Sequence, residues 1–268
     1  SAEEILARIR RRADDEPAYV LLSYAQSLDG SIAHGASTDE RLLLSGRASL
    51  ALTHAVRNAV DAVAIGVGTA LADDPRLTVR LRWPPETAAP PRDDDDDDVV
   101  PQPAAVVFDS RARTPPDGRL VAQARHGRRV FVVVSATRGA DDDDDSCLAH
   151  RVAALRARGV VVTACPPART GDRVDLRAAL AMLRAEHHVR SVMVEGGAAI
   201  IDTVLSHNLA DDVLLTIAPV FVGGLRAAPS SGSRVARLDA TLVASLGDDA
   251  IVYGSTVVDE TTTAPSTP

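Results

Sequence analysis

The stretch that decides the fold is SVMVEGGAAIIDTVLS, from Ser191 to Ser206. Its first part, Ser191–Val194, is an apolar run rich in valine, which predicts a buried strand. Two glycines follow Glu195, and the apolar positions after them recur with the period of a helix that ends at Ser206. A buried strand that passes through a glycine turn into a helix is the repeating unit of an α/β protein with a parallel sheet.

The same alternation continues in both directions along the chain. The predicted strands are Tyr19–Ala25, Ala62–Val67, Ala104–Phe108, Val130–Ser135, Val160–Thr163, Val213–Ile217, Thr241–Leu246 and Ile251–Val258. The other predicted helices are Ser45–Val60, with Ser45 as its N-cap, Ser146–Arg158 and Val174–Glu186. We therefore expect an α/β fold, with a mostly parallel central sheet flanked by helices and a C-terminal antiparallel hairpin at the sheet edge.

The length of 268 residues is enough for one large domain with a sizeable core. We expect a single domain over residues 19–258, preceded by an N-terminal helical extension over residues 1–18. The polar tail Asp259–Pro268 is expected to be disordered.

The net charge of −8 comes from two aspartate runs, Asp93–Asp98 and Asp141–Asp145. Without them the chain carries a slight positive balance. We interpret the runs as acidic insertions in surface loops, near residues 84–103 and 139–146. Aromatic residues are few and arginine is scattered, which argues against a nucleic-acid partner.

The composition excludes several kinds of chemistry. The chain has no lysine, so a lysine nucleophile or Schiff base is impossible. Cys147 and Cys165 have no metal-ligand spacing, so we expect free thiols and no metal site. No apolar run reaches the length of a membrane span, and no membrane partner is expected. We expect a cytoplasmic protein, with organellar import left open.

Glycines follow two of the predicted strands. A sheet of this kind binds ligands at the carboxyl ends of its strands. Gly66 and Gly68 would let backbone N–H groups approach a phosphate or a ring closely, and Gly196 and Gly197 open a helix whose N-terminus suits a pyrophosphate. Each pair is also explained by an ordinary turn or a close helix–sheet contact, so neither is decisive alone.

Polar side chains cluster near the same strand ends. The guanidinium forks of Arg57 and Arg80 match phosphate oxygens, although any single surface arginine has a plain solvated explanation. Glu195 could accept hydrogen bonds from an amino-substituted ring or hold a proton near a reaction, and Asp29 follows the first strand in a tight Asp-Gly turn. Taken together, these residues predict an anion-binding pocket at the strand ends.

Several longer stretches then resemble a known family. They are SYAQSLDGSIA (Ser23–Ala33), THAVRNAVDAVAIGVGTALADDPRLTVR (Thr53–Arg80), VVFDSRARTP (Val106–Pro115), VMVEGGAAIIDTVLS (Val192–Ser206) and TIAPVFVGG (Thr216–Gly224). In this order they resemble the pyrimidine reductases of riboflavin biosynthesis, most closely the stand-alone reductases of fungi and archaea. The long Gly-Thr to Leu-Thr-Val-Arg stretch is far more specific than a lone glycine motif.

The resemblance implies a dihydrofolate-reductase-like fold, NADPH as the hydride donor and a homodimer. It implies 2,5-diamino-6-ribosylamino-4(3H)-pyrimidinone 5′-phosphate as substrate, with the ribosylamino group reduced to the ribitylamino form. A cofactor that carries the hydride also explains why the sequence shows no nucleophile or metal site.

The family pattern assigns roles to individual residues of this chain. The implied cofactor-binding residues are Ala25, Gly66, Gly68, Thr69, Asp73, Ser110, Gly196 and Gly197. The implied substrate-binding residues are Arg57, Leu77, Arg80 and Glu195, and the implied catalytic residues are Asp29 and Glu195.

Three alternatives stay open at this point. Arg111 or Arg113 beside Ser110 would suit the 2′-phosphate of NADPH, but surface arginines explain them equally, so NADH is not excluded. A related NAD(P)H reductase could act on another phosphorylated or pteridine-like substrate. The hypothesis from a different functional class is a non-enzymatic nucleotide-binding or scaffold protein, whose acidic loops bind a basic partner.

Overall fold

A computed structural model describes residues 1–12, 18–35, 42–85, 101–136, 142–169, 173–227 and 236–258. The run Asp93–Asp98 and the tail Asp259–Pro268 lie outside these residues, and so do Asp141 and the side chains of residues 142–145. In the described part of the chain, no helix is long and apolar enough to cross a membrane.

The helices and strands alternate along most of the chain. The helices are α1 (Ala2–Arg12), α2 (Arg47–Arg57), α3 (Val67–Asp73), α4 (Arg119–Ala122), the 3-10 helix η3 (Gln123–His126), α5 (Asp142–Arg156), α6 (Leu176–His187) and α7 (Ala198–Ser206). The strands are β1 (Tyr19–Ser27), β2 (Ser31–Ala33), β3 (Ala62–Gly66), β4 (Ala104–Phe108), β5 (Val130–Ser135), β6 (Val161–Cys165), β7 (Ser191–Glu195), β8 (Asp212–Ala218), β9 (Leu225–Arg226), β10 (Ala236–Leu246) and β11 (Asp249–Val258).

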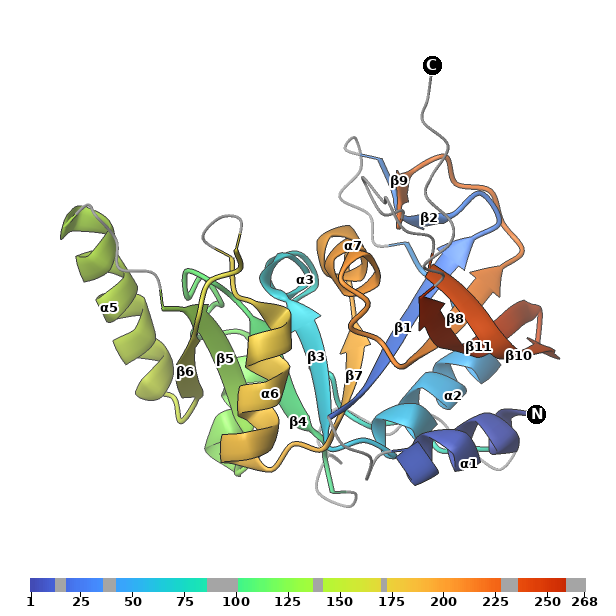
Figure 1. Cartoon of the computed structure of the whole chain (residues 1–268), viewed down its shortest axis with the longest axis horizontal. Helices are drawn as coiled ribbons and strands as arrows, with labels where there is room; N and C mark the ends of the chain where they lie inside the picture. Colours follow the sequence, from blue (N-terminus) through green and yellow to red (C-terminus); the bar gives the residue numbers. More distant parts are fainter. Residues whose placement is uncertain are drawn as a thin grey trace.

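Within the described residues, the strands form a nine-stranded sheet in the order β10-β11-β8-β1-β7-β3-β4-β5-β6 (Figure 1). From β8 to β6 neighbouring strands are parallel, whereas β11 runs antiparallel to both β8 and β10. The predicted fold class is therefore confirmed, including the antiparallel hairpin at the edge. A smaller sheet pairs β2 with β9.

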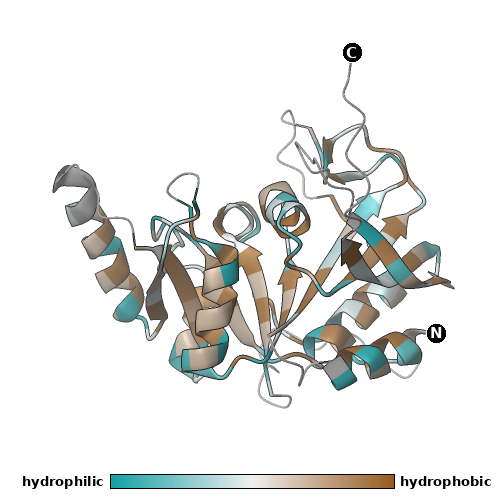
Figure 2. Cartoon of the chain, in the orientation of Figure 1, coloured by the Kyte–Doolittle hydropathy of each residue, from teal (hydrophilic) through white to brown (hydrophobic). Residues whose placement is uncertain are grey.

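Helices cover the two faces of the large sheet. One core contains apolar side chains from α1, α2, α4 and α5, and the other contains those from α6 and α7. The strands β4 and β5 are buried at every position, and the middle of the sheet is mostly apolar, drawn in tan to brown in Figure 2, because both of its faces are covered. Ile5, Leu6 and Ile9 place α1 in the same core as the sheet, so this helix packs against the body of the protein.

The start of α2 differs from the prediction. Its N-cap is Gly46 rather than Ser45, and no side chain caps the helix. The N–H of Gly46 instead donates to Oδ2 of Asp249 (2.8 Å) on the C-terminal hairpin. This tertiary hydrogen bond ties the start of α2 to the hairpin, and the N–H groups of the first helical turn have no side-chain cap.

Other boundaries shift as well. The predicted strand Ala62–Val67 ends one residue earlier, and Val67–Asp73 is the helix α3 rather than a loop. α5 begins at Asp142, four residues before the predicted Ser146. β10 begins at Ala236, earlier than the predicted Thr241.

Candidate active site

The strands β1, β7 and β3 are neighbours at the centre of the sheet, and their carboxyl ends lie at the same edge. β7 ends at Glu195 and continues through two glycines into α7. β3 ends at Gly66 and continues directly into α3. Figure 1 shows α3 and α7 side by side above this edge. The candidate site predicted at the strand ends is assembled here.

Glu195 is held by Arg57, the last residue of α2. Nε of Arg57 donates to Oε1 (2.6 Å), and Nη2 donates to Oε2 (2.7 Å). The two side chains are only 11% and 18% exposed. Burial opposes the charge on the guanidinium, but the charge and hydrogen bonds of Glu195 raise the pKa of Arg57. The structure therefore joins two predicted substrate residues into one bidentate ion pair.

Arg57 also contacts the segment Arg76–Leu81, which we call the strap. Its Nη1 donates to the carbonyl oxygen of Thr78 (2.9 Å). One turn earlier on α2, Nδ1 of His54 accepts from the N–H of Arg80 (2.8 Å) and, at 3.4 Å, from that of Leu81. Because residues three apart lie on the same face of a helix, one face of α2 holds the strap in place.

Side chains from other elements hold the rest of the strap. Gln102 accepts from the N–H of Val79 (2.7 Å) and donates to its carbonyl oxygen (3.3 Å). Arg128 donates to the carbonyl oxygens of Arg76 (2.6 Å) and Leu77 (2.8 Å). The strap thus has an ordered backbone although it belongs to no sheet.

Two predicted substrate residues lie on the strap, in different environments. Leu77 has a left-handed backbone (φ 57°), and its side chain is buried in the core. That side chain is therefore not presented to the site, so any contact from Leu77 would have to come from its backbone. Arg80, by contrast, is exposed.

The glycines Gly196 and Gly197 form a tight cradle at the start of α7. Gly197 is the N-cap of α7, and no side chain caps the helix. A Cβ added to Gly197 would lie 3.2 Å from Oγ1 of Thr69 on α3, and one added to Gly196 would lie 2.1 Å from Cγ2 of Ile200. Uncapped N–H groups beside a threonine hydroxyl fit a phosphate or pyrophosphate group.

The other residues of the α3 region have separate positions. Gly66 is the N-cap of α3, also without a side-chain cap, and Gly68 is exposed in its first turn with open space around its Cα. Asp73 is the last residue of α3, and its carbonyl oxygen accepts from Arg119 (3.2 Å). The glycines can therefore approach a ligand, whereas Asp73 lies at the opposite end of the helix.

Asp29 is fully engaged by its own loop and by the segment after β8. Its carboxylate accepts from the hydroxyls of Ser27 (2.6 Å) and Ser31 (2.9 Å), and from the N–H groups of Val222 (2.9 Å) and Gly223 (2.8 Å). These bonds, led by that from Ser27, hold the pKa of Asp29 well below its usual range. The geometry is that of a loop clamp, and a carboxylate so held is a poor proton donor.

Ala25 and Ser110 lie to either side of this centre. Ala25 is half-buried on β1, where it pairs with Thr216 of β8. Ser110 follows β4, and its hydroxyl accepts from the N–H of Val174 (3.0 Å). Within the described part of the chain, neither residue forms a hydrogen bond to Arg57 or Glu195.

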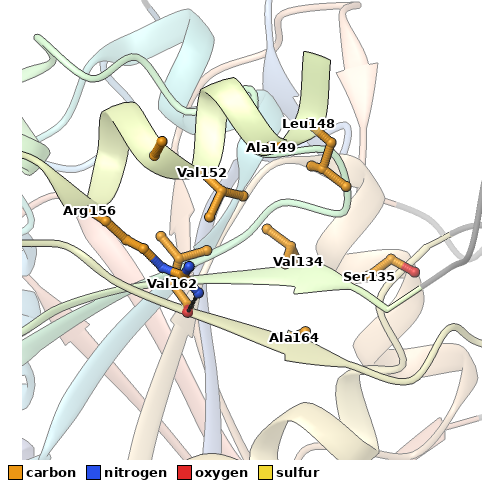
Figure 3. A pocket seen from close by; sticks show the side chains of 9 residues that line it. Val134, Ser135, Leu148, Ala149, Val152, Arg156, Val162 and Ala164 are labelled. Atoms are coloured by element: carbon orange, nitrogen blue, oxygen red, sulfur yellow. Dashed lines mark hydrogen bonds between the residues drawn. The ribbon is translucent and has the colours of Figure 1, made fainter. Parts of the chain in front are cut away.

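A pocket of about 650 Å³ lies between α5 and the strands β5 and β6 (Figure 3). Its lining is mostly apolar: Val134, Ser135, Leu148, Ala149, Val152, Ala153, Arg156, Val162 and Ala164. The N–H of Ser135 donates to the carbonyl oxygen of Ser110 (3.2 Å), so the pocket adjoins the residue expected at the adenosine end of a cofactor. The buried hydroxyl of Ser135 has no hydrogen-bond partner within the described structure.

The described residues contain no group of three or more His, Cys, Asp or Glu side chains that could hold a metal ion. The donor set at the strand ends instead consists of helix N–H groups, one hydroxyl, a guanidinium–carboxylate pair and an exposed arginine. Such a set suits a phosphate-bearing organic ligand.

The family model of the RibD C-terminal domain matches residues 18–252. The chain belongs to this family. A 2,5-diamino-6-ribosylamino-4(3H)-pyrimidinone 5′-phosphate reductase from Methanothermobacter thermautotrophicus is 34% identical over 77% of this chain and 80% of its own length. The same-named protein from Archaeoglobus fulgidus is 32% identical over 77% of this chain and 82% of its own length. The resemblance inferred from the sequence is thereby confirmed.

A solved structure of the Saccharomyces cerevisiae riboflavin biosynthesis reductase Rib7 has the same fold, with a TM-score of 0.64 at 23% identity. The match covers 90% of this RibD-family chain and 90% of Rib7. His54, Gln102 and Arg128 were not among the predicted site residues. His54 does stand in the family-like stretch, three residues before Arg57, and this spacing is the one signal that could have identified it.

Proposed function

We propose that this protein reduces the ribosylamino group of 2,5-diamino-6-ribosylamino-4(3H)-pyrimidinone 5′-phosphate to the ribitylamino form, with NADPH as the reductant. Family membership supports the reaction, since the M. thermautotrophicus relative bears the name of that reductase. The observation that carries the proposal is the bidentate ion pair between Arg57 and Glu195. Glu195 lies directly before the two glycines that open α7.

The cofactor is proposed to bind at the strand ends. Gly197 and the uncapped start of α7 would hold the pyrophosphate, with Thr69 alongside. The adenosine end would extend past Ser110 towards the pocket beside Ser135. When bound, NADPH supplies the hydride that reduces C1′ of the ring-opened substrate.

The chain's own residues are proposed to bind and orient the substrate. Arg80 would bind the 5′-phosphate. Glu195, oriented by Arg57, would accept hydrogen bonds from the amino groups of the pyrimidine. Asp29 is assigned a positioning role, because its clamp orders the loop between β1 and β2.

The test is an assay of NADPH oxidation with the ribosylaminopyrimidine phosphate and with dihydrofolate in parallel. We expect turnover of the phosphorylated pyrimidine alone, and no turnover of it would contradict the proposal. Loss of a charge-assisted contact costs about 1.5–3 kcal/mol, so Arg80→Ala is expected to raise the substrate KM by at least about tenfold. Arg125→Ala, at another exposed arginine, serves as the matched control and should leave KM unchanged.

A homodimer is also proposed, as the family resemblance implies. The exposed side chains of Leu28, Phe221 and Leu225 support an apolar contact on the β2–β9 side of the molecule. Light scattering after size-exclusion chromatography tests the oligomeric state, and a monomer at micromolar concentration would count against the dimer.

A further inference from the structure

The strap that carries Arg80 depends on a residue with no assigned role. We propose that His54 is a positioning residue, which sets the place of the Arg80 guanidinium by accepting the N–H of Arg80. The inference rests on the proposed function, in which Arg80 binds the substrate phosphate. His54 would act through Arg80, without touching the substrate.

The first support is geometric. The 2.8 Å bond from the N–H of Arg80 to Nδ1 of His54 fixes the backbone at the base of the arginine side chain. His54 is 1% exposed, and its helix is fixed in turn by the Arg57–Glu195 pair. The anchor is therefore a rigid group on a helix, and a displacement of about 1 Å at such a point is enough to impair binding.

The second support is the chemistry of the imidazole. Nδ1 can accept a hydrogen bond only while it carries no proton. Burial, followed by the positive charges of Arg57 and Arg80, lowers the pKa of His54 to about 3. The ring is therefore neutral at neutral pH, and the N–H of Arg80 that points at Nδ1 selects the tautomer in which Nε2 carries the proton and Nδ1 accepts.

The third support is that different side chains bond to different backbone groups of the strap. Gln102 holds Val79, and Arg57 holds the carbonyl oxygen of Thr78. The N–H groups of Arg80 and Leu81 both donate to Nδ1 of His54. Loss of this one acceptor should loosen the Arg80 end of the strap and leave the remainder anchored.

The experiment compares two conservative replacements of His54. Asn places a carbonyl oxygen near the position of Nδ1, whereas Gln extends its amide beyond that position. We expect His54→Asn to keep the substrate KM within about threefold of wild type, and His54→Gln to raise it about tenfold. In both variants kcat and the NADPH KM should change by less than about threefold, because the reacting centre is intact. His126→Gln, at an exposed histidine, is the matched control.

A direct readout accompanies the kinetics. Hydrogen–deuterium exchange of a peptide containing Arg80 and Leu81 should accelerate in His54→Gln and stay near wild type in His54→Asn. A general loss of structure would instead accelerate exchange across α2 and the sheet. Equal exchange at Arg80 in wild type and His54→Gln would overturn the inference.

The double variant His54→Gln/Arg80→Ala separates this inference from the proposed function. If His54 acts through Arg80, the double variant should have the same substrate KM as Arg80→Ala. Additive effects would overturn the role of His54 and leave the phosphate contact standing. If Arg80→Ala alone leaves KM unchanged, the phosphate contact is wrong, and the positioning role falls with it.

Discussion

Replacement of Arg57 by methionine is expected to destabilise the protein by about 3 kcal/mol. The substitution removes both hydrogen bonds to Glu195 and the bond to the carbonyl oxygen of Thr78, which is fully buried. Removal of one partner of a buried ion pair costs about 3–5 kcal/mol, mostly because the other charge stays buried and unpaired. Since Glu195 keeps 18% exposure, water can partly solvate it, and the lower end of that range applies.

The assay is urea denaturation at neutral pH, with the midpoint and slope compared between variant and wild type. For a chain of this size, 3 kcal/mol corresponds to a fall in Tm of roughly 6–12 °C. Arg8→Met is the matched control, because Arg8 pairs with Glu4 at 3.3 Å where the side chains are 28% and 48% exposed, and like Arg57 it also donates to a carbonyl oxygen, that of Ala240 (3.2 Å). The free energy of unfolding of that variant should fall by less than about 1 kcal/mol. An equally small fall in the free energy of unfolding of Arg57→Met would refute the reasoning, since the buried Arg57–Glu195 pair would then contribute no more than a surface pair.

Three further predictions concern acid stability, thiol reactivity and the glycine cradle. The folded-state pKa of His54, about 3, lies below its unfolded value, so folding excludes a proton from this ring. As the pH falls below 6, the free energy of unfolding of wild type should therefore decrease by up to about 1.4 kcal/mol per pH unit more than that of His54→Asn. Urea midpoints that fall in parallel for the two proteins would contradict this. Burial, with the nearby charge of an aspartate, raises the pKa of Cys165 to about 11. Iodoacetamide at pH 8 should therefore modify only the exposed Cys147 in the native protein, and both thiols after unfolding. Mass spectrometry counts the modified thiols. Gly196→Ala places its Cβ 2.1 Å from Cγ2 of Ile200 and should weaken NADPH binding at least about tenfold, as measured by a fluorescence titration. The second substitution Ile200→Ala should partly restore the affinity. An unchanged affinity in Gly196→Ala would exclude a close-packed cradle.

The layout of the sheet was largely predictable, because most of its strands are buried on both faces. Val130–Ser135 is buried at every position, so its sequence is a continuous apolar run with the bounds that were predicted. The helix α3 was not predicted, since seven residues that start at a glycine N-cap are too few to display a helical period. The short strand β9 has only two residues and depends entirely on its pairing with β2.

The candidate site was predictable as a set of residues and not as an arrangement. Arg57 and Glu195 were both singled out, but they are far apart in the sequence, and no local pattern shows that they bind each other. Asp29 was singled out from its Asp-Gly turn, but its hydrogen bonds were not predictable, because two of its four donors, the N–H groups of Val222 and Gly223, belong to the segment after β8. His54 was not predicted, because its spacing from Arg57 indicates a shared helix face but does not show that this face meets the strap.

The position of β1 has a consequence for synthesis on the ribosome. β1 is made early, yet both of its neighbours in the sheet come late: Tyr19 pairs with Ser191 on β7, and Leu21 pairs with Asp212 on β8. At about 5–20 residues per second, β1 waits roughly 10–40 s for these partners to emerge. During that time β3, β4, β5 and β6 can assemble in chain order, while an apolar strand stays without its partners. The centre of the sheet is thus completed only after β7 and β8 have emerged, and a nascent chain that stops short of β7 leaves β1 without either neighbour.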